Sequence, residues 1–236
     1  MGKWLTRSGQ IEPCVYQPGQ PSRYKVMIPT DRLTPTEVDE LHGAGARRSG
    51  WLFYKLNCPT CQLCQPLRLA AADFVMSRSQ RRVWKRNQDL DIRLGRPQSC
   101  PTRVALYNKH LFGRGLNTTD EEITVEQYER WLVQSGLETL EFAYFEHGEL
   151  LGLGLLDVGE NDASSVYFYF DPACSKRSLG TYSILKQIEW VRQHNKRFLY
   201  LGFHNDQCPA LRYKAGFSPH AVLTSDDGAL KWSDTG

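Results

Sequence analysis

The alternation of apolar and polar residues is clearest in the second half of the chain. Three segments rich in aromatic and branched side chains follow one another, and His147-Gly148 between the first two is a two-residue hairpin signal. Tyr182, Leu185 and Ile188 then recur with helical spacing. The predicted order is three antiparallel strands over 137–146, 150–158 and 164–172, a helix over 178–195 with Asn195 as its C-cap, a strand over 196–203 and a short helix over 206–217.

The first half has weaker periodicity, and its helices are marked by their starting residues. Thr34, Pro35 and Glu37 form a capping-box start for a short helix that Gly43 or Gly45 ends. Strands are predicted on either side of a cysteine-rich turn, and polar starts precede three further helices. These elements are strands over 49–57 and 66–74 and helices over 77–90, 101–112 and 124–134.

Length and composition indicate a globular protein rather than a membrane or disulfide-built one. The 236 residues are 41% hydrophobic and 23% charged, which is typical of a globular chain with one large or two small domains. No run of eighteen apolar residues occurs, and the stretch "MGKWLTRSGQ" lacks the apolar core of a secretion signal. We therefore expect a cytoplasmic protein with no membrane partner.

Charge changes this picture at one place in the chain. The net charge is only +3, yet between Ser77 and Arg96 seven basic side chains face only Asp89 and Asp91. The predicted helix over 77–90 carries most of them, with Val83 and Trp84 as its apolar anchors. Such a run is either a solvated face or a binding surface for a phosphate-rich partner. No base-reading motif is present, so we expect contacts to an RNA backbone, with no DNA partner. The candidate side chains are Arg78, Arg81, Arg82, Lys85 and Arg86.

The cysteine-rich turn is the second candidate site. Cys58, Cys61 and Cys64 are spaced so that successive thiolates in a turn can point at one centre, and Cys14 is the expected fourth ligand. Zinc and an iron–sulfur cluster both suit four thiolates, and the spacing does not separate them. The alternative is that these residues are small buried side chains or reactive thiols, because free cysteine packs well in protein cores.

The element order of the second half resembles that of the GCN5-related N-acetyltransferases. This superfamily binds the pyrophosphate of coenzyme A at a loop that begins its main helix, and the corresponding stretch here is Arg177-Ser178-Leu179-Gly180-Thr181-Tyr182. Tyr182 replaces a small residue, so we expect its ring to crowd the pyrophosphate path and do not expect coenzyme A as donor. Tyr213, Gly216 and Phe217 match a later motif of the superfamily. The resemblance implies an α+β chain with a Cys-containing domain over 1–76 and an acetyltransferase-like domain over 77–236.

A more specific resemblance joins these features. The chain resembles the aminoacyl-tRNA–protein transferases, which comprise eukaryotic arginyltransferases and bacterial aspartate/glutamate leucyltransferases. The combination of motifs is specific and covers most of the chain, and the bacterial form is more similar because of the tight cysteine triplet. The motifs are "EPCVYQPG", "ARRSGWLFYK", "CPTCQLCQPLRL", "SRSQRRVWKRNQDL", "YFYFDP", "SKRSLGTYSILKQIEW" and "YLGFHNDQCPALRYKAGFSPHAVL".

This resemblance implies an enzyme that moves an aminoacyl group from charged tRNA to the N-terminal Asp or Glu of an acceptor protein. Leucine is the expected amino acid, because the bacterial branch of the family transfers leucine. The product enters an N-degron pathway of protein degradation. Arginyl transfer is the first alternative. Two alternatives of other classes are a coenzyme A-dependent N-acetyltransferase and a non-enzymatic, metal-stabilised RNA-binding protein. The chemistry needs no cofactor, because the aminoacyl ester is already activated.

The implied reaction needs positioning, an oxyanion donor and one proton acceptor, because an α-amine with a pKa of about 7.7–8.0 is partly neutral near pH 7. Asp171 is the candidate acceptor of the proton, although its Asp-Pro pair also suits a strand end. Tyr213 stands where acetyltransferases often place a general acid, and a packed ring is compatible with that role. His204 is a candidate for proton transfer, although a lone His is more often structural.

The resemblance also implies binding residues around the start of the main helix. Arg177, Ser178 and Gly180 are expected to contact the tRNA, and Tyr182 to stack on its terminal adenosine. An acidic acceptor terminus requires a cation, and the candidates are Lys214, Arg212 and Arg177, with a solvated surface as the alternative for each. The segments 107–128 and 203–205 depart from the family pattern, which leaves the transferred amino acid and the acceptor open.

Overall fold

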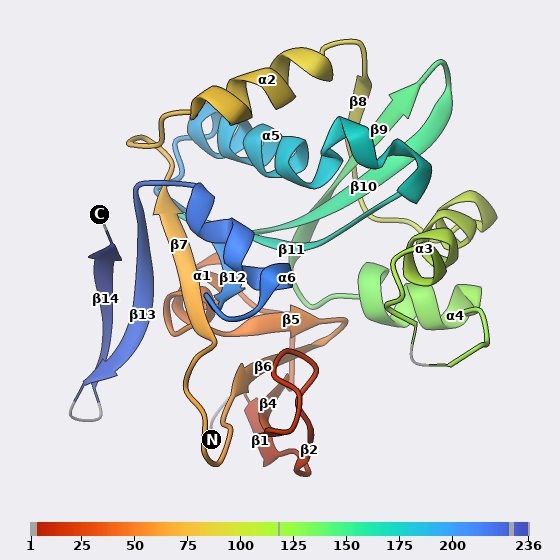
Figure 1. Cartoon of the computed structure of the whole chain (residues 1–236). Helices are drawn as coiled ribbons and strands as arrows, with labels where there is room; N and C mark the ends of the chain where they lie inside the picture. The colour runs from red at the N-terminus through yellow and green to blue at the C-terminus, as the bar shows by residue number, and fades with distance from the viewer. Residues whose placement is uncertain (1–3, 118, 227–228, 236) are drawn as a thin grey trace.

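The computed structural model describes residues 4–117, 119–226 and 229–235. A large mixed β-sheet lies at its centre (Figure 1). The strands of this sheet are β7 (Gln65–Ala70), β8 (Asp91–Gly95), β9 (Glu138–Glu146), β10 (Glu149–Val158), β11 (Ala163–Phe170), β12 (Phe198–His204), β13 (His220–Asp226) and β14 (Ala229–Thr235). Their spatial order is β14-β13-β7-β12-β11-β10-β9-β8. Neighbouring strands are antiparallel except for β11 and β12, which run parallel.

A smaller antiparallel layer, built from the N-terminal residues, lies below the large sheet in Figure 1. It contains β1 (Trp4–Ser8), β4 (Tyr24–Pro29), β5 (Arg47–Ser49) and β6 (Leu52–Leu56) in the order β1-β4-β6-β5, with the ribbon of β2 (Glu12–Pro13) and β3 (Pro21–Ser22) and the helix α1 (Pro35–Gly43). Asp39 of α1 fastens this layer to the turn between β10 and β11, where its carboxylate accepts from the Asn161 amide at 2.7 Å and from the Asp162 amide at 3.2 Å.

Helices cover both faces of the central strands. The helical segments are α2 (Arg78–Arg86), α3 (Pro101–Gly113), α4 (Val125–Tyr128), the π-helical η1 (Glu129–Val133), η2 (Pro172–Arg177), α5 (Leu179–Gln193), α6 (Pro209–Arg212) and η3 (Tyr213–Gly216). In Figure 1, α2 and α5 lie above the sheet, while α3 and α4 lie beside its other face. Alternate residues of β9 and β11 accordingly enter two cores, with Tyr144 and Phe170 under α5 and Ala143 and Tyr169 under α3.

Glycine in β10 allows α5 to lie close to the sheet. A Cβ at Gly154 would lie 2.7 Å from Ser183 Oγ and 3.3 Å from Gln187 Nε2, both on α5. A larger residue would displace these side chains. The close packing fixes the position of the α5 N-terminus over the sheet.

The predicted element order is confirmed: three antiparallel strands, a helix, a strand and a short helix follow in that sequence. The predicted capping box at Thr34 is present, and capping boxes also begin the helices at Ser77 and Thr124. Helix ends agree less well. The basic helix ends at Arg86 because Asn87 turns its amide back onto a helical carbonyl, and α5 ends at Gln193, with His194 rather than Asn195 as its cap.

Strand β7 belongs to the large sheet, where it pairs with both β12 and β13. The cysteine-rich turn therefore connects a strand of the small layer to a strand of the large sheet, as expected for a turn between two strands. The division into domains at residue 76 stays a prediction. None of the helices in the described ranges has the length and apolar character needed to cross a membrane. Residues 1–3 of the N-terminal stretch lie outside those ranges.

Candidate active site

The parallel strands β11 and β12 separate soon after they begin, and the region between their diverging ends, with the side chains inserted there, is called the cleft below. They pair only at Ala163 with Leu199 and at Ser164 with Tyr200. Beyond this point the carbonyl groups of β11 have no strand partner on that side. These carbonyl groups need other hydrogen-bond partners.

Arg47 of β5 inserts its guanidinium into this cleft. Its Nη1 donates to the carbonyl of Ser165 at 2.6 Å, and its Nη2 donates to the carbonyl of Val166 at 2.6 Å. Gly202 of β12 faces it with a φ of +81°, and a Cβ there would lie 2.6 Å from Arg47 Cζ. Glycine is thus required at 202 by conformation and by space. Because arginine does not lose its proton, the cleft contains a fixed positive charge.

Lys214 of η3 is the second basic group in the cleft. Its Nζ donates to the carbonyl of Phe203 on β12 at 2.7 Å. Burial, and then the neighbouring charge of Arg47, lower the pKa of Lys214 to about 7. An amine with this pKa is about half neutral at pH 7, so it can accept a proton, which an ordinary surface lysine cannot do at that pH.

Tyr213 precedes Lys214 and lies at the mouth of the cleft with 49% of its surface exposed. Loss of solvent around its hydroxyl raises the pKa of Tyr213, although the positive charges of Arg47 and Arg114 oppose this shift. The phenol therefore keeps its proton at neutral pH. Its place beside two arginines and a lysine of lowered pKa agrees with a role as proton donor, which remains a prediction.

Asp171 and His204, the other two catalytic candidates, lie at strand ends with partners of their own. Asp171 accepts from the Ala173 amide at 2.9 Å and from Lys109 Nζ at 2.5 Å. Burial tends to raise the pKa of Asp171, but these hydrogen bonds outweigh it and keep the pKa below the usual value. Such a carboxylate is a weak proton acceptor at pH 7. His204 is buried and lies 3.2 Å from Asp206, measured from Nε2 to Oδ1.

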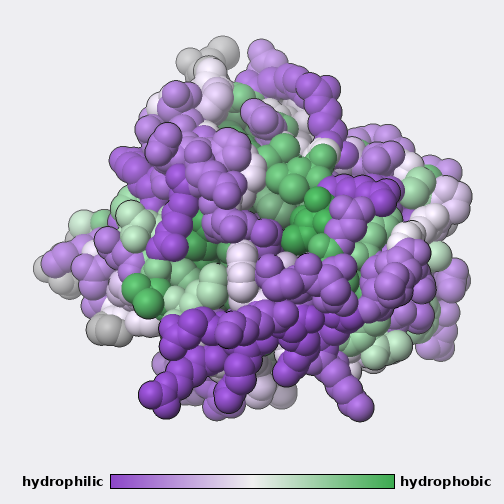
Figure 2. Space-filling view, turned by 90° about the horizontal axis from the view of Figure 1, so that it is seen from above, coloured by the Kyte–Doolittle hydropathy of each residue, from purple (hydrophilic) through white to green (hydrophobic). Residues whose placement is uncertain are grey.

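The basic helix α2 lies on the outer side of α5, with Val83 and Trp84 packed against the core as its expected anchors. Figure 2 views the molecule from the side on which α2 lies and shows strongly hydrophilic side chains over much of this face. The five predicted tRNA-contacting side chains are all exposed: Arg78, Arg81, Arg82, Lys85 and Arg86. Arg86 also donates to the carbonyl of Lys176, which joins α2 to the loop before α5.

That loop brings the predicted residues at the start of α5 beside α2. Ser178 has a left-handed conformation, and its side chain makes no capping bond, so backbone amides at the start of α5 have no side-chain partner there. A Cβ at Gly180 would make only ordinary contact, at 3.7 Å from the Phe168 ring. Arg177 is already paired, with Asp89 at 2.8 Å and with Glu146. Its charge is therefore largely neutralised, which does not favour binding of an acceptor carboxylate.

The placement of Tyr182 corrects one expectation. Its side chain is only 2% exposed and packs between Trp84 and Tyr144, with ring centroids 5.7 and 5.9 Å away. The ring does not narrow the surface above the start of α5, so the expected crowding of a pyrophosphate is wrong. The same burial does not favour stacking of this ring on an adenosine. Tyr182 joins α2 and α5 to the sheet.

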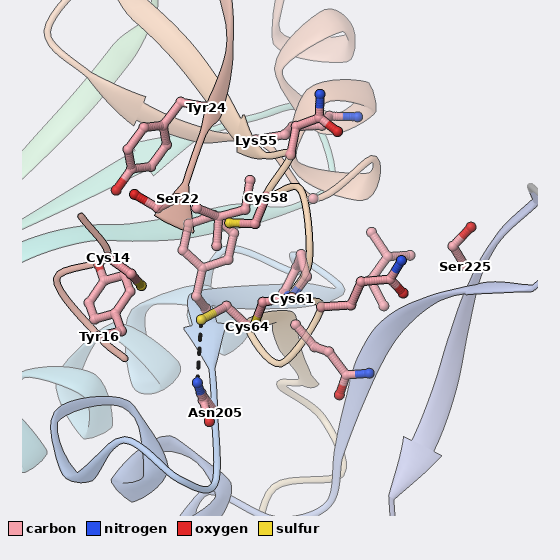
Figure 3. Close-up of a pocket in the computed structure, with 18 of the residues that line it drawn as sticks. Cys14, Tyr16, Ser22, Tyr24, Lys55, Cys58, Cys61, Cys64, Asn205 and Ser225 are labelled. Carbon is pink, nitrogen blue, oxygen red and sulfur yellow. Dashed lines mark hydrogen bonds between the residues drawn. The ribbon is translucent and has the colours of Figure 1, made fainter. Parts of the chain in front are cut away.

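The four predicted metal ligands line a single pocket of about 580 Å³ between the cysteine-rich turn and the small layer (Figure 3). Cys64 Sγ accepts from Asn205 Nδ2 at 3.5 Å, and burial raises the pKa of the Cys64 thiol. Within the described ranges, no group of three or more His, Cys, Asp or Glu side chains is arranged to hold a metal ion. The zinc or iron–sulfur centre at Cys14, Cys58, Cys61 and Cys64 therefore stays a prediction.

Arg47 and Arg114 are site residues that the sequence reasoning missed. A signal for Arg47 was present: two adjacent arginines in a short strand must point to opposite faces, and few strands of a small layer can place both in solvent. Arg48, the neighbour of Arg47, is indeed buried on the other face against Asp157. Arg114 is the exposed C-cap of α3, and its charge acts on the Tyr213 hydroxyl. Arg212, by contrast, was predicted and is exposed on α6.

Two family models together match most of the chain. A family model described as Arginine-tRNA-protein transferase, N terminus, matches residues 12–82, and the corresponding C-terminus model matches residues 102–224. Aspartate/glutamate leucyltransferase of Pseudoalteromonas atlantica is 36% identical over 212 residues, 89% of this chain and 90% of the relative. Its counterpart in Methylobacillus flagellatus is 34% identical over 210 residues, 89% of this chain and 85% of the relative.

Solved structures are less similar. A crystal structure of FemX matches with a TM-score of 0.45 and 7% identity, covering 84% of this chain and 79% of FemX. The structure of L-PGS from Bacillus licheniformis matches with a TM-score of 0.44 and 11% identity, covering 72% of this chain and 50% of that one.

Proposed function

Since this chain belongs to the arginine-tRNA-protein transferase family and is an aminoacyl-tRNA–protein transferase, we propose that it moves leucine from charged tRNA to proteins that begin with Asp or Glu. The named activity of its relatives supports leucine and the acidic acceptors. We infer that β9–β12 and α5 form an acetyltransferase-like acyl-transfer unit. Leucine at a protein N-terminus then marks the acceptor for an N-degron pathway, in the cytoplasm where charged tRNA is available.

The observation that carries this proposal is the pair Arg47 and Lys214 in the cleft between β11 and β12. The amine of the acceptor attacks the ester carbonyl, an amide bond forms, and the bond to the terminal ribose of the tRNA breaks. Lys214, with its pKa of about 7, takes the proton of the attacking amine. Arg47 places positive charge next to the strand where the carbonyl oxygen becomes negative. Tyr213 supplies a proton to the departing ribose oxygen.

Binding of the tRNA uses α2 and the start of α5. Arginine side chains on α2 contact phosphates of the acceptor stem, and the amides at the start of α5 receive a phosphate near the 3′ end, where the helix dipole is favourable. The carboxylate of the acceptor's first residue requires a positively charged side chain that takes no part in proton transfer. Arg114, whose charge reaches the Tyr213 hydroxyl, and Arg212, exposed on α6, are better suited to it than the neutralised Arg177.

Loss of charge on α2 tests the tRNA surface. The double variant Arg78→Ala/Arg82→Ala should weaken tRNA binding at low salt and reduce the slope of log Kd against log salt concentration by about 2, since each lost phosphate contact removes about 1. The double variant Arg7→Ala/Arg32→Ala is the matched control, because it removes two exposed arginines from the small N-terminal layer. Fluorescence titration at several salt concentrations measures both slopes. If log Kd depends on log salt concentration equally in the two variants, the tRNA binds at a surface other than α2.

The function itself is tested with labelled amino acids. Purified protein is incubated with leucyl-tRNA or arginyl-tRNA and with peptides that begin with Asp, Glu, Ala or Lys. We expect labelled leucine on the Asp and Glu peptides only. Transfer of arginine instead would support the arginyl alternative. Absence of label from every pairing, with tRNA binding intact, would favour an RNA-binding protein without this activity.

A further inference from the structure

A second cavity, of about 360 Å³, lies beside the cleft and plays no part in the mechanism above. It is lined by the small N-terminal layer, by α3, by the π-helical η1 and by β11, and it is open to solvent on one side. Most of its walls are aromatic or aliphatic, and the main contributors are Tyr54, Tyr107, Trp131, Leu132, Val166 and Tyr167. Such a cavity suits one apolar side chain rather than an extended polymer.

The charges around this cavity are already satisfied. Arg48 lines it, but its guanidinium donates to Asp157 at 2.7 and 2.9 Å and to the carbonyl of Gly50 at 2.9 Å. Burial raises the pKa of Tyr107 and of Tyr167, so both phenols are neutral. No carboxylate side chain is among the described residues that line the cavity. A cationic side chain would enter without a partner, at a high desolvation cost.

The cavity shares residues with the reactive cleft. Val166 lines the cavity, and its carbonyl accepts from Arg47 in the cleft. Tyr54 lines the cavity and is the cross-strand partner of Arg47 in the β5–β6 pair, so the two side chains lie on one face. The Tyr54 ring also packs at 6.2 Å from Phe203, whose carbonyl accepts from Lys214. The cavity therefore borders the residues that hold Arg47 and Lys214 in place.

The π-helix gives the cavity its rim and floor. In η1 the amide of Gln134 donates to the carbonyl of Glu129, five residues earlier. This wide turn leaves Trp131 40% exposed at the rim and buries Leu132. Gly50 holds η1 in place, since its φ is +56° and a Cβ there would lie 2.3 Å from the carbonyl oxygen of Arg130. π-Helical turns of this kind are frequent at functional sites.

We propose that this cavity holds the leucyl side chain of the charged tRNA while its ester lies in the cleft between Arg47 and Lys214. The proposal rests on the proposed leucyl transfer, and it assigns the choice of leucine over arginine to the aromatic walls and to the absence of a free carboxylate. The cavity thus selects the donor amino acid, while the acceptor is selected outside it.

Two changes at Val166 test this assignment. One tRNA is charged in turn with Leu, Phe, Ala and Arg, so that only the side chain differs, and kcat/KM is measured with an Asp peptide. Val166→Phe fills the cavity and should lower kcat/KM for Leu about 10- to 200-fold, the range for a methylene-sized misfit in such a pocket. Val166→Ala enlarges it and should raise the ratio of Phe to Leu about 10-fold. The native chain should use Arg least.

Val125→Ala is the matched control, because it makes the same chemical change at an exposed position of α4 outside the cavity. It should leave the order of donors unchanged. Thermal unfolding and tRNA titration of each variant separate misfolding and lost tRNA binding from a change of selectivity. Val166→Ala is a small change and keeps the test valid where Val166→Phe fails to fold.

The possible failures are distinguishable. If the native chain transfers no amino acid to any peptide, the proposed function is wrong and the cavity has no leucyl role. If the native chain transfers leucine but Val166→Ala leaves the order of donors unchanged, the cavity proposal alone is overturned. If Val166→Ala changes the order of acceptor peptides and leaves that of the donors, the cavity holds the acceptor terminus instead.

Discussion

We expect Lys214→Met to lower kcat for leucyl transfer at pH 7 by about 10²- to 10⁴-fold, the usual range for removal of a general base. Methionine keeps the length of the side chain and cannot accept a proton. Lys214 donates to the Phe203 carbonyl, which fixes its amine beside Arg47. Single-turnover transfer of labelled leucine to an Asp peptide measures the chemical step without product release.

The pH dependence separates a base from a simple cation. In the native chain the rate should rise through pH 7 as Lys214, with its pKa of about 7, loses its proton. The acceptor amine gives a second rise near its own pKa of about 7.7–8.0. In Lys214→Met only this second rise should remain. Lys214→Arg keeps the positive charge, so it should be as slow as Lys214→Met if the group is a base. If Lys214→Arg transfers leucine at the native rate, Lys214 acts as a cation that binds the acceptor and not as a base.

Lys214→Met should lower activity without lowering stability. The lowered pKa means that the unfolded chain binds a proton between pH 7 and the ordinary lysine pKa while the folded chain does not. Stability therefore rises with pH across this window, and below it the full cost of burying the charge is present. Lys214→Met removes that cost and should not lower the free energy of unfolding. The control Lys231→Met, on β14, should leave both rate and stability unchanged.

Local signals in the sequence were sufficient for much of the fold. Thr34, Ser77 and Thr124 each begin a helix with a capping box, because a side-chain oxygen and a residue three positions later decide the start without any distant contact. His147 and Gly148 both have positive φ, as a two-residue hairpin requires. Helix ends were less certain. Asn195 does have the positive φ expected of a residue after a helix, but one position beyond the cap.

Long-range contacts were not visible in the sequence. Nothing local indicates that β7 enters the large sheet between β12 and β13, or that Lys109 lies 2.5 Å from Asp171 across 62 residues. The exposed arginines of α2 could be predicted, since helical charge patterning determines which residues face solvent. The burial of Tyr182 could also have been predicted, because it shares its helical face with Leu185 and Ile188.

The cleft itself depends on a residue that acts on the other face of β5. Arg48 and Asp157 form an ion pair in which each side chain is 1% exposed, and Thr139 Oγ1 donates to the same carboxylate at 2.8 Å. This pair joins β5 of the small layer to β10 of the large sheet. Arg47 precedes Arg48 in β5, so it reaches the cleft only while this ion pair holds β5 against β10. The ion pair therefore positions a group that it does not contact.

Asp157→Asn should accordingly lower the free energy of unfolding by about 3–5 kcal/mol, because it leaves the Arg48 charge buried without its counterion. Asp91→Asn is the matched control, since Asp91 pairs with Arg93 at 2.7 Å but is 59% exposed, and it should cost no more than about 1 kcal/mol. Urea unfolding at pH 7 measures both. The double variant Arg48→Met/Asp157→Leu removes both charges and should recover most of the loss. If the double variant is stable but transfers leucine slowly, the ion pair positions Arg47 by holding β5 in place. If Asp157→Asn does not lower the free energy of unfolding, the small layer is held to the large sheet by Asp39 and the cleft residues instead.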